Sequence, residues 1–494
     1  MGERGLRGRS LPTIAVAAAL GLLLVSAVSA GSVLPFPVSD DPYVNPGSAH
    51  KTQVEPDSFA FGQTIVTTSQ SGRYFSGGGA SNNVFATSQD GGRTWATGGL
   101  PGTTVNEGGT WPRISDPAVA YDPEHDVWLA QGLTINSSGT GDSVIVNRST
   151  DGGLTWSNPV TVAASPGTFW DKTWIACDVW PQSPHYGNCY SQWDDNGLGN
   201  QMMMSTSEDG GLTWSAPQSP STPSGLGGQP VVQPNGTVVV PYTANYSSIQ
   251  AFRSINGGDS WEPGVFVASQ VQHFVAGNMR IHPLPSAEVD GAGRVYVVWH
   301  DCQFRSGCSS NDIVMSTSTN GVDWTAKTRI PIDPANSTVD HFLPGIGADR
   351  ASPGRLGLGY YYFPQASCSS STCDLNYGFV SSLDGGATWS APTQVSRTMR
   401  PTWIANTNQG YMVGDYTSTS FTADGKAHTV FSDSKPPDGR TSCYPTNTGC
   451  HQRMAKATFD VTDPPGPLVR ARRDTVRYWP PRRPEDAPYY PRTD

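Results

Sequence analysis

Short runs of alternating apolar and polar residues recur along the chain, and each run is bounded by Gly, Pro, Asp or Asn. Residues 116–122, 127–130 and 295–299 are examples. Alternation with a period of two is typical of β-strands that bury one face. The pattern therefore predicts an all-β protein.

A polar turn with the pattern Ser-x-Asp-Gly-Gly-x-Thr-Trp occurs six times, with small variations, at intervals of 47 to 64 residues. This interval suits one four-stranded sheet per repeat. We expect the Asp or Asn to cap the turn, the glycines to supply positive φ, and the Trp to anchor the repeat in the core, which is a structural role. The capping positions are Asp90, Asp151, Asp209, Asn256, Asn320 and Asp384.

A seventh unit with strand-like alternation spans residues 411–460 but lacks the turn. Because a single such sheet cannot bury both of its faces, we expect the units to close radially into one β-propeller over residues 56–462. Seven blades are preferred, six are the alternative, and the repeated turns should join the third and fourth strands. Residues 31–55 would be an N-terminal extension, and the Pro- and Arg-rich residues 463–494 a disordered tail.

The N-terminus has the order of a secretory signal peptide over residues 1–30: three arginines, an apolar run, and a Val-Ser-Ala triplet. An uncleaved membrane anchor is the alternative, and no later segment could span a bilayer. Export places the chain in an oxidising, extracellular compartment. The eight cysteines are neighbours in pairs, which predicts four local disulfides rather than a zinc site: Cys177 with Cys189, Cys302 with Cys308, Cys368 with Cys373, and Cys443 with Cys450.

Composition and charge exclude some fold types and binding partners. Charged residues make up 15% of the chain, the formal charge is −10, and 55 Gly and 41 Pro residues make it rich in turns. Long surface helices and coiled coils are therefore not expected. A phosphate backbone needs a basic surface, so a nucleic-acid partner is excluded. We expect a monomer whose partner is an extracellular glycan or glycoconjugate.

The repeated turn resembles the Asp-box, or BNR repeat, of the sialidase superfamily. The resemblance implies a β-propeller whose turns lie on the face away from the ligand site. It also implies an arginine cluster that binds a carboxylate, an Asp acid/base, and a Tyr nucleophile activated by a Glu. The residues that match most closely are Arg113 and Arg280, with Arg305 or Arg400 as third arginine, Asp301 or Asp116 as acid/base, Tyr416 as nucleophile and Glu107 as its partner.

The motifs around Arg113 and Arg280 depart from the family's Phe/Tyr-Arg-Ile-Pro, because they read Pro-Arg-Ile-Ser and Met-Arg-Ile-His. An independent argument uses the fold alone: residues just before each first strand should converge at one mouth of the central channel. The residues in this position are Arg113, Asp116, Asp171, Lys172, Gln229, Arg280, His282, Asp340, His341, Arg400, Asp415 and Tyr416. We expect about half of this set to be structural caps and bridges between blades.

These observations predict a secreted glycoside hydrolase of the exo-α-sialidase type that needs no cofactor. Calcium held by close carboxylates is an alternative. One competing hypothesis is a propeller that binds glycans or proteins without catalysis. Another is a polysaccharide lyase or different glycosidase that uses His282 or His341 together with a Tyr.

Overall fold

The structure is a computed structural model that describes residues 1–2, 35–221, 223–443, 449–461 and 475–478. Apart from residues 1 and 2, the predicted signal peptide lies outside these ranges. Within them, no helix has the length and apolar character needed to cross a membrane. The regular structure is almost entirely β, which confirms that the protein is all-β. Four short 3₁₀ helices interrupt the strands: η1 (Val105–Glu107), η2 (Asn196–Leu198), η3 (Ser306–Cys308) and η4 (Pro401–Trp403).

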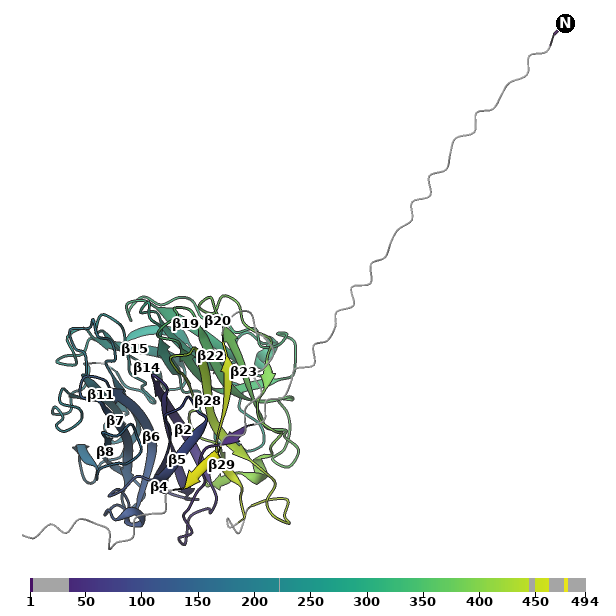
Figure 1. Ribbon diagram of the computed structural model, residues 1–494. Coiled ribbons are helices and arrows are strands. Elements are labelled where there is room, and N and C mark those ends of the chain that lie inside the picture. The colour runs from purple at the N-terminus through teal and green to yellow at the C-terminus, as the bar shows by residue number, and fades with distance from the viewer. Residues whose placement is uncertain (3–34, 222, 444–448, 462–474, 479–494) are drawn as a thin grey trace, which may run out of the picture. The chain divides into compact units, whose positions relative to one another are not determined.

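The strands form consecutive antiparallel groups that lie side by side in Figure 1. In chain order the groups are β2 (Gln53–Phe61), β3 (Thr64–Arg73), β4 (Ala80–Ser88) and β5 (Thr94–Gly99); β6 (Arg113–Asp122), β7 (Val127–Ile135), β8 (Gly141–Ser149) and β9 (Val160–Ala164); β10 (Trp170–Cys177), β11 (Cys189–Asp195) and β12 (Gln201–Ser207); β13 (Val231–Val232), β14 (Val238–Ala244), β15 (Ser248–Ser254) and β16 (Val265–Ser269); β17 (Ser286–Val289), β18 (Val295–Asp301), β19 (Asp312–Ser318) and β20 (Thr328–Arg329); β21 (Asp340–Ala348), β22 (Leu356–Phe363), β23 (Asn376–Ser382) and β24 (Thr393–Gln394); and β27 (Ser418–Phe421), β28 (Lys426–Ser434) and β29 (Gln452–Asp460). A hairpin of β25 (Ala405–Thr407) and β26 (Gly410–Met412) precedes the last group.

Two ends of the chain meet at this last group. β1 (Phe36–Pro37) pairs with β29, whose edge would otherwise leave backbone groups without partners. Ser418 of β27 donates a hydrogen bond to the carbonyl oxygen of Ser58 in β2 at 3.0 Å. The predicted extension at residues 31–55 therefore contributes β1 and the start of β2 to the sheets.

Part of the C-terminal tail is also ordered as a strand. β30 (Thr475–Tyr478) pairs in parallel with β5, where the outer edge of that strand offers free backbone groups. The remainder of the predicted tail, residues 463–474 and 479–494, lies outside the described ranges.

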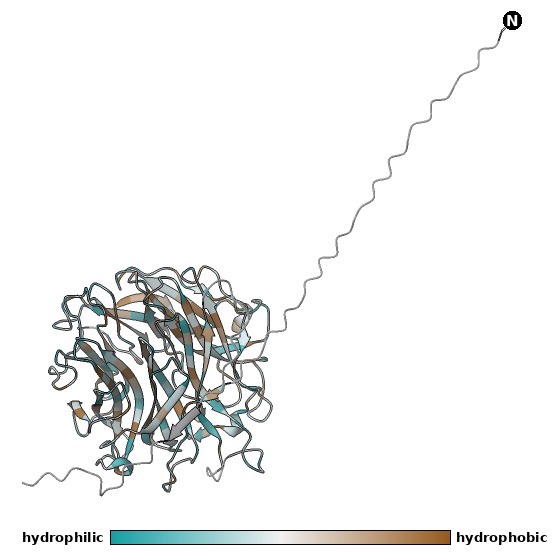
Figure 2. Ribbon diagram, in the orientation of Figure 1, coloured by the Kyte–Doolittle hydropathy of each residue, from teal (hydrophilic) through white to brown (hydrophobic). Residues whose placement is uncertain are grey.

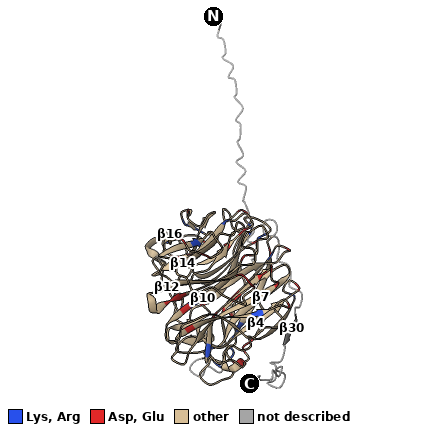
Figure 3. Ribbon diagram, turned by 90° about the vertical axis from the view of Figure 1, so that its left-hand side faces the viewer, with Lys and Arg blue, Asp and Glu red and all other residues tan. Residues whose placement is uncertain are grey.

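Apolar side chains fill the space between neighbouring groups. The largest core cluster includes Tyr190, Tyr242 and Trp299, all fully buried, which come from β11, β14 and β18. Figure 2 shows brown, apolar segments along the strands and teal, polar segments in the loops. Charged residues are sparse over the ribbon in Figure 3, as the composition requires.

Each repeated turn is held by its acidic or amide side chain. In the second turn, Asp151 Oδ1 accepts hydrogen bonds from the backbone nitrogens of Leu154 at 3.0 Å and Thr155 at 2.9 Å. Its Oδ2 accepts from the Thr155 hydroxyl at 2.6 Å. The indole of Trp156 donates to the carbonyl of Gly153, whose φ is 84°. The capping role that the sequence suggested is thus visible in the hydrogen bonds.

The four predicted disulfides are confirmed. Each closes a short loop between two adjacent strands of one group, with sequence separations of 12, 6, 5 and 7 residues. Such loops reach from one strand to its neighbour, so the disulfides stabilise individual connections and do not join distant parts of the chain. No free cysteine occurs among the described residues.

Replacing Asp151 tests how much one turn contributes. Asp151→Ala should lower the free energy of unfolding by about 1–2 kcal/mol, because the turn's backbone donors lose their partner. Asp151→Asn is the matched control, since Asn256 already accepts from the Ser260 backbone nitrogen at 3.1 Å in the fourth turn. Urea unfolding of both variants measures the difference, and equal losses would contradict the capping role.

Candidate functional site

The first strands of four groups contain a β-bulge at corresponding positions. The bulged residues have positive φ: Glu55 at 55°, Asp116 at 45°, Lys172 at 47° and Leu343 at 51°. The pairing of each strand shifts register around them. Positive φ is costly for residues other than glycine, and bulges commonly redirect a side chain near a functional site. Three of the four bulges carry a charged residue.

These charges meet two others in what we call the charged cluster: Glu55, Asp116, Lys172, Arg280 and Asp415. Lys172 Nζ lies 2.6 Å from Asp415 Oδ2 and 3.6 Å from Asp116 Oδ1. Arg280 donates to Asp415, and its guanidinium lies 4.0 Å from Glu55. Oxygen atoms of the three carboxyl groups lie within 4.8 Å of one another, and each of the three residues is only 1% exposed.

Burial separates the protonation states of these carboxyl groups. It raises the pKa of Glu55 to about 8, and the neighbouring Asp116 and Asp415 add to this rise. Burial also raises the pKa of Asp116, to about 6, although Lys172 opposes it. For Asp415, burial is outweighed by Arg280 and Lys172, which hold its pKa well below the usual range. At neutral pH the cluster therefore holds a protonated carboxyl beside ionised ones, which is the arrangement of an acid and a base.

Neutral and basic groups surround the cluster. Gln70 Nε2 donates to Glu55 and, at 3.0 Å, to the Ser115 hydroxyl. Arg73 is buried close by, and its pKa falls to about 10 because of burial and the nearby Arg280. Its guanidinium donates to the carbonyl oxygen of Gly79 at 2.8 Å.

Tyr416 lies beside the carboxyl groups but is held by the backbone. Its hydroxyl donates to the carbonyl oxygen of Pro117 at 2.9 Å, and its ring meets Trp174 edge-on at 4.8 Å. Burial, together with Glu55, raises the pKa of the Tyr416 hydroxyl well above its usual value. This environment disfavours the ionised phenol that a nucleophile needs.

A small pocket lies beside the cluster, lined by Lys172, Trp174, Gly228, Leu284 and Tyr416 among others. A second pocket shares Trp174 with it and is lined by the first strands of several groups. Small apolar surfaces with a few convergent polar groups are typical of ligand sites.

The structure brings together seven residues that the sequence nominated. Four of them form the charged cluster with Glu55. The other three lie near its members: the Asp171 carboxylate is 3.4 Å from Lys172, burial lowers the pKa of His282 against the opposing charge of Asp415, and Tyr416 is described above. The seven are Asp116, Asp171, Lys172, Arg280, His282, Asp415 and Tyr416.

Two of the nominated arginines lie at the edges of groups. Arg113 stacks its guanidinium on the Tyr74 ring at 3.9 Å and donates to the carbonyl of Ser76 at 2.6 Å. Arg400 forms an ion pair with Asp374 at 3.1 Å, and both side chains are more than a third solvent-exposed. Neither arginine contacts the charged cluster.

Arg305 and His341 belong to a different buried network. Arg305 donates to Asp312 at 2.9 Å and to Asp333 at 2.7 Å. His341 packs against the ring of Tyr360 at 5.5 Å, and burial lowers its pKa. The guanidinium of Arg305 therefore belongs to this network with Asp312 and Asp333.

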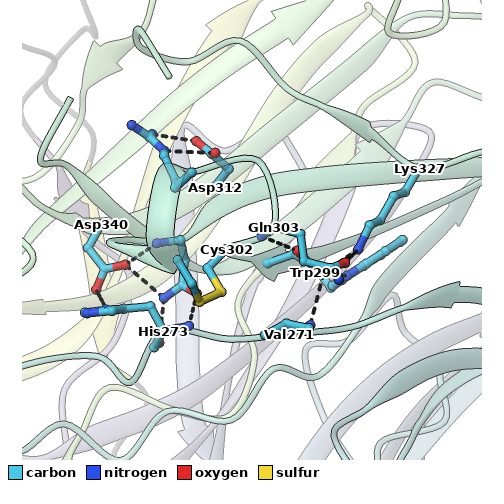
Figure 4. Close-up of a disulfide and its surroundings, with 12 residues drawn as sticks. Val271, His273, Trp299, Cys302, Gln303, Asp312, Lys327 and Asp340 are labelled. Carbon is cyan, nitrogen blue, oxygen red and sulfur yellow. Dashed lines mark hydrogen bonds and ion pairs between the residues drawn. A yellow bond between two sulfur atoms is a disulfide. The ribbon is translucent and has the colours of Figure 1, made fainter. Parts of the chain in front are cut away.

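Asp301 and Glu107 also have partners of their own. Lys327 Nζ lies 2.7 Å from the Asp301 carboxylate, and the backbone nitrogen of Gln303 donates to it at 2.8 Å (Figure 4). Glu107 accepts a hydrogen bond from the Tyr43 hydroxyl at 2.7 Å. Both carboxylates hold neighbouring segments of the chain through these bonds, and neither lies in the charged cluster.

Sequence reasoning missed Glu55 and Arg73. Glu55 was placed in the N-terminal extension, so the first group had no nominated residue. A signal was available, because Glu55-Pro56 in β2 matches Asp116-Pro117 in β6, and both acidic residues occupy the bulge of a first strand. Arg73 is at the end of a second strand, a position that the argument from first strands does not cover.

Calcium does not fit either carboxylate group that lies close enough to bind a metal. In the charged cluster, Lys172 and Arg280 already supply the positive charge between the carboxylates. In the group of Asp312, Asp333 and His341, the cation is Arg305. Calcium prefers six to eight oxygen ligands, which neither site offers beside these cations.

Comparison with known proteins agrees with the repeated turns. Residues 142–358 match the BNR repeat-like domain family. The predicted resemblance is thus confirmed for that part of the chain. No curated protein matches the sequence.

Solved structures with a similar arrangement of strands are remote. The intramolecular trans-sialidase from Ruminococcus gnavus has 14% identity and a TM-score of 0.43, covering 87% of this chain and 99% of its own. The α-L-arabinofuranosidase of Fusarium graminearum has 15% identity and a TM-score of 0.43, covering 71% and 98%. A polysaccharide lyase acting as an ulvan lyase has 10% identity and a TM-score of 0.46, covering 83% and 94%. These scores are too low to transfer an activity.

Asp415 should be the residue on which the cluster's stability depends. Asp415→Asn leaves Lys172 and Arg280 buried without their shared anion, so we expect a loss of about 3–5 kcal/mol in the free energy of unfolding. Asp374→Asn is the control, because it breaks the exposed pair with Arg400 and should cost less than about 1 kcal/mol. Urea unfolding at pH 7 compares them, and similar losses would show that the cluster does not depend on Asp415.

Proposed function

We propose that this chain is a secreted glycoside hydrolase of the sialidase-like type, with the charged cluster as its active site. The observation that carries the proposal is the placement of a protonated Glu55 beside the ionisable Asp116 and the ionised Asp415, next to a pocket. Glycosidases need such a pair, because one carboxyl must donate a proton while another acts as base or nucleophile. The four disulfides fit an extracellular site of action.

In the proposed reaction, Glu55 donates its proton to the leaving oxygen while Asp116 attacks the anomeric carbon. Water then releases the sugar from Asp116, with Glu55 acting as the base. The close spacing of the carboxyl oxygens favours this retaining route, since inverting enzymes keep their carboxyl groups about 6.5–9.5 Å apart to admit a water. Asp415 stays ionised and fixes Arg280 and Lys172.

Sialosides are the proposed substrates because the charged cluster holds two cations, with a third nearby. The Arg280 side chain is 13% exposed, while Lys172 and Arg73 are buried. Two guanidinium groups and one ammonium can bind a sugar carboxylate, although the clamp differs from the three arginines that the resemblance implied. We assign the nucleophile to Asp116 in place of Tyr416 because the Tyr416 hydroxyl is bound to Pro117 and its pKa is raised.

The proposal includes a closed propeller of seven blades. Seven strand groups follow one another, each first strand lies beside the first strand of the next group, and β2 lies beside β27. The pairing of β1 with β29 supports closure, because the last blade takes its outer strand from the start of the chain. The repeated turns follow the third strand of a group in each of the first six.

A non-catalytic glycan-binding protein is the second candidate, and the burial of the carboxyl groups favours it. Glu55, Asp116 and Asp415 are each 1% exposed, so a substrate must enter through the more accessible Arg280 and Asp171. A binder would use those two residues and leave the carboxyl groups as internal support.

Turnover of aryl glycosides separates the two candidates. The mature protein should release the aryl group from an aryl sialoside, or from another member of a panel of aryl glycosides. Glu55→Gln should reduce kcat by about 10²–10⁴-fold, because the general acid is lost. The substitution copies the protonated Glu55, so the fold should survive, which thermal unfolding checks.

Asp301→Asn is the control, because Asp301 lies outside the cluster and pairs with Lys327. It should keep wild-type turnover once folding is verified. Glycan binding without turnover would favour the second candidate. Turnover that is unchanged in Glu55→Gln and lost in Asp301→Asn would place the active site at Asp301 and refute the proposed assignment.

The pH dependence of kcat/KM should be bell-shaped. Activity should rise as Asp116 ionises, around pH 6, and fall as Glu55 loses its proton, around pH 8. Lys172→Met should move the acidic limb to higher pH, because Lys172 lowers the pKa of Asp116. A profile that is flat between pH 5 and pH 9 would contradict these roles.

A further inference from the structure

Arg280 is the one cation of the charged cluster that a loop supplies. It lies in the connection between β16 and β17, residues 270–285, which we call the strap. The strap leaves the fourth group, contacts loops of the fifth and sixth groups, and then pairs with β26 before it enters β17. Residues far from the cluster therefore decide where Arg280 lies.

The first anchor of the strap is Asn311, which is fully buried. Its Oδ1 accepts a hydrogen bond from the backbone nitrogen of His273 at 2.7 Å, and its Nδ2 donates to the His273 carbonyl at 2.8 Å. A second bond to Asp340 at 2.8 Å fixes the amide. Beside it, the backbone nitrogen of Cys302 donates to the carbonyl of Val271 at 2.8 Å. The Asn311 side chain thus bonds to both backbone groups of His273, as a neighbouring strand would.

The second anchor is the hairpin of β25 and β26. The backbone nitrogen of Arg280 donates to the carbonyl of Tyr411 at 2.8 Å, and the Tyr411 nitrogen donates to the carbonyl of Asn278 at 2.8 Å. Arg280 Nε also donates to Gln409 at 2.8 Å. These bonds fix both the backbone and the guanidinium of Arg280, which pairs with Asp415.

Between the anchors, the strap passes a second disulfide at Gly277. Its φ is 72°, and a Cβ atom at this position would lie 2.8 Å from Cys373 Sγ and 3.2 Å from Pro401. Cys373 is tied to Cys368, so its sulfur cannot swing away. Only glycine allows this close approach.

We propose that Asn311 and Gly277 are positioning residues that fix Arg280 over the charged cluster and thereby set its affinity for an anionic sugar. The inference rests on the proposed function for the role of Arg280 in substrate binding. The placement itself does not depend on activity, since it follows from the contacts of the strap.

Asn311→Ala and Gly277→Ala test the proposal. In each variant, amide hydrogen exchange in residues 274–284 should become at least about 10-fold faster, because the bond from Arg280 to Tyr411 opens more often. KM for the aryl sialoside should rise about 10-fold with kcat within about 3-fold, since a displaced Arg280 weakens binding more than chemistry. The matched control is Gly199→Ala, which has a φ of 74° but no atom within 4 Å of the added Cβ.

Unchanged exchange and unchanged KM in both variants would overturn the proposal. So would the same changes in Gly199→Ala, because they would reflect backbone strain alone. If the wild-type protein turns over no glycoside, the proposed function fails, and hydrogen exchange decides the positioning role by itself: faster exchange over residues 274–284 in both variants supports it, and unchanged exchange refutes it.

Discussion

Burial of charge on the first strands is the constraint on which the rest of the site depends. Asp415 can remain ionised without water only because Lys172 and Arg280 contact it. Lys172 and Arg280 also lower the pKa of Glu55, but burial and the neighbouring Asp116 and Asp415 outweigh them and raise it. The difference between Glu55 and Asp415 is therefore a consequence of how the two cations are shared among buried carboxyl groups.

The repeated turns and the apolar core stabilise the sheets and so offset the backbone strain at the bulges. Each turn satisfies its own backbone donors through a single side chain, as Asp151 does, and each group buries aromatic residues such as Trp299 against its neighbour. The sheets are then rigid enough to hold Glu55, Asp116 and Lys172 at positive φ, which an isolated strand would relax. Stability is concentrated in the sheets, and strain is concentrated at the bulges.

Much of the fold could be predicted from the sequence because its signals are local. The turn around Asp151 and the pair Cys302 and Cys308 each lie within a few residues, so spacing alone identifies them. Asp116, Lys172 and Asp415 could be nominated because they lie at or just before the start of first strands. Glu55 was missed because its strand lacks an earlier repeat to align with, and the residue was assigned to an extension.

Partners across loops are harder to predict. Arg305 and Asp301 were nominated because of their order in the chain, and the structure pairs them with Asp312 and Lys327, outside the charged cluster. Spacing in the sequence carries no information about which loop lies over which group. Arg280 is the opposite case. Its motif departs from the family pattern, yet a long strap places it beside Asp415.

The division of labour between strands and strap has a chemical consequence. The carboxyl groups that would carry proton transfer lie on bulged strands, where their geometry and pKa are fixed by the core. Arg280, which would select the substrate, lies on a loop held by hydrogen bonds and close contacts with two disulfide-closed connections. Under the proposed function, changes in the strap would therefore alter which sugar binds while Glu55 and Asp116 keep their positions. Chemistry and selectivity would then be built on separate elements of this fold, and the two would meet at Asp415, which contacts Lys172 and Arg280.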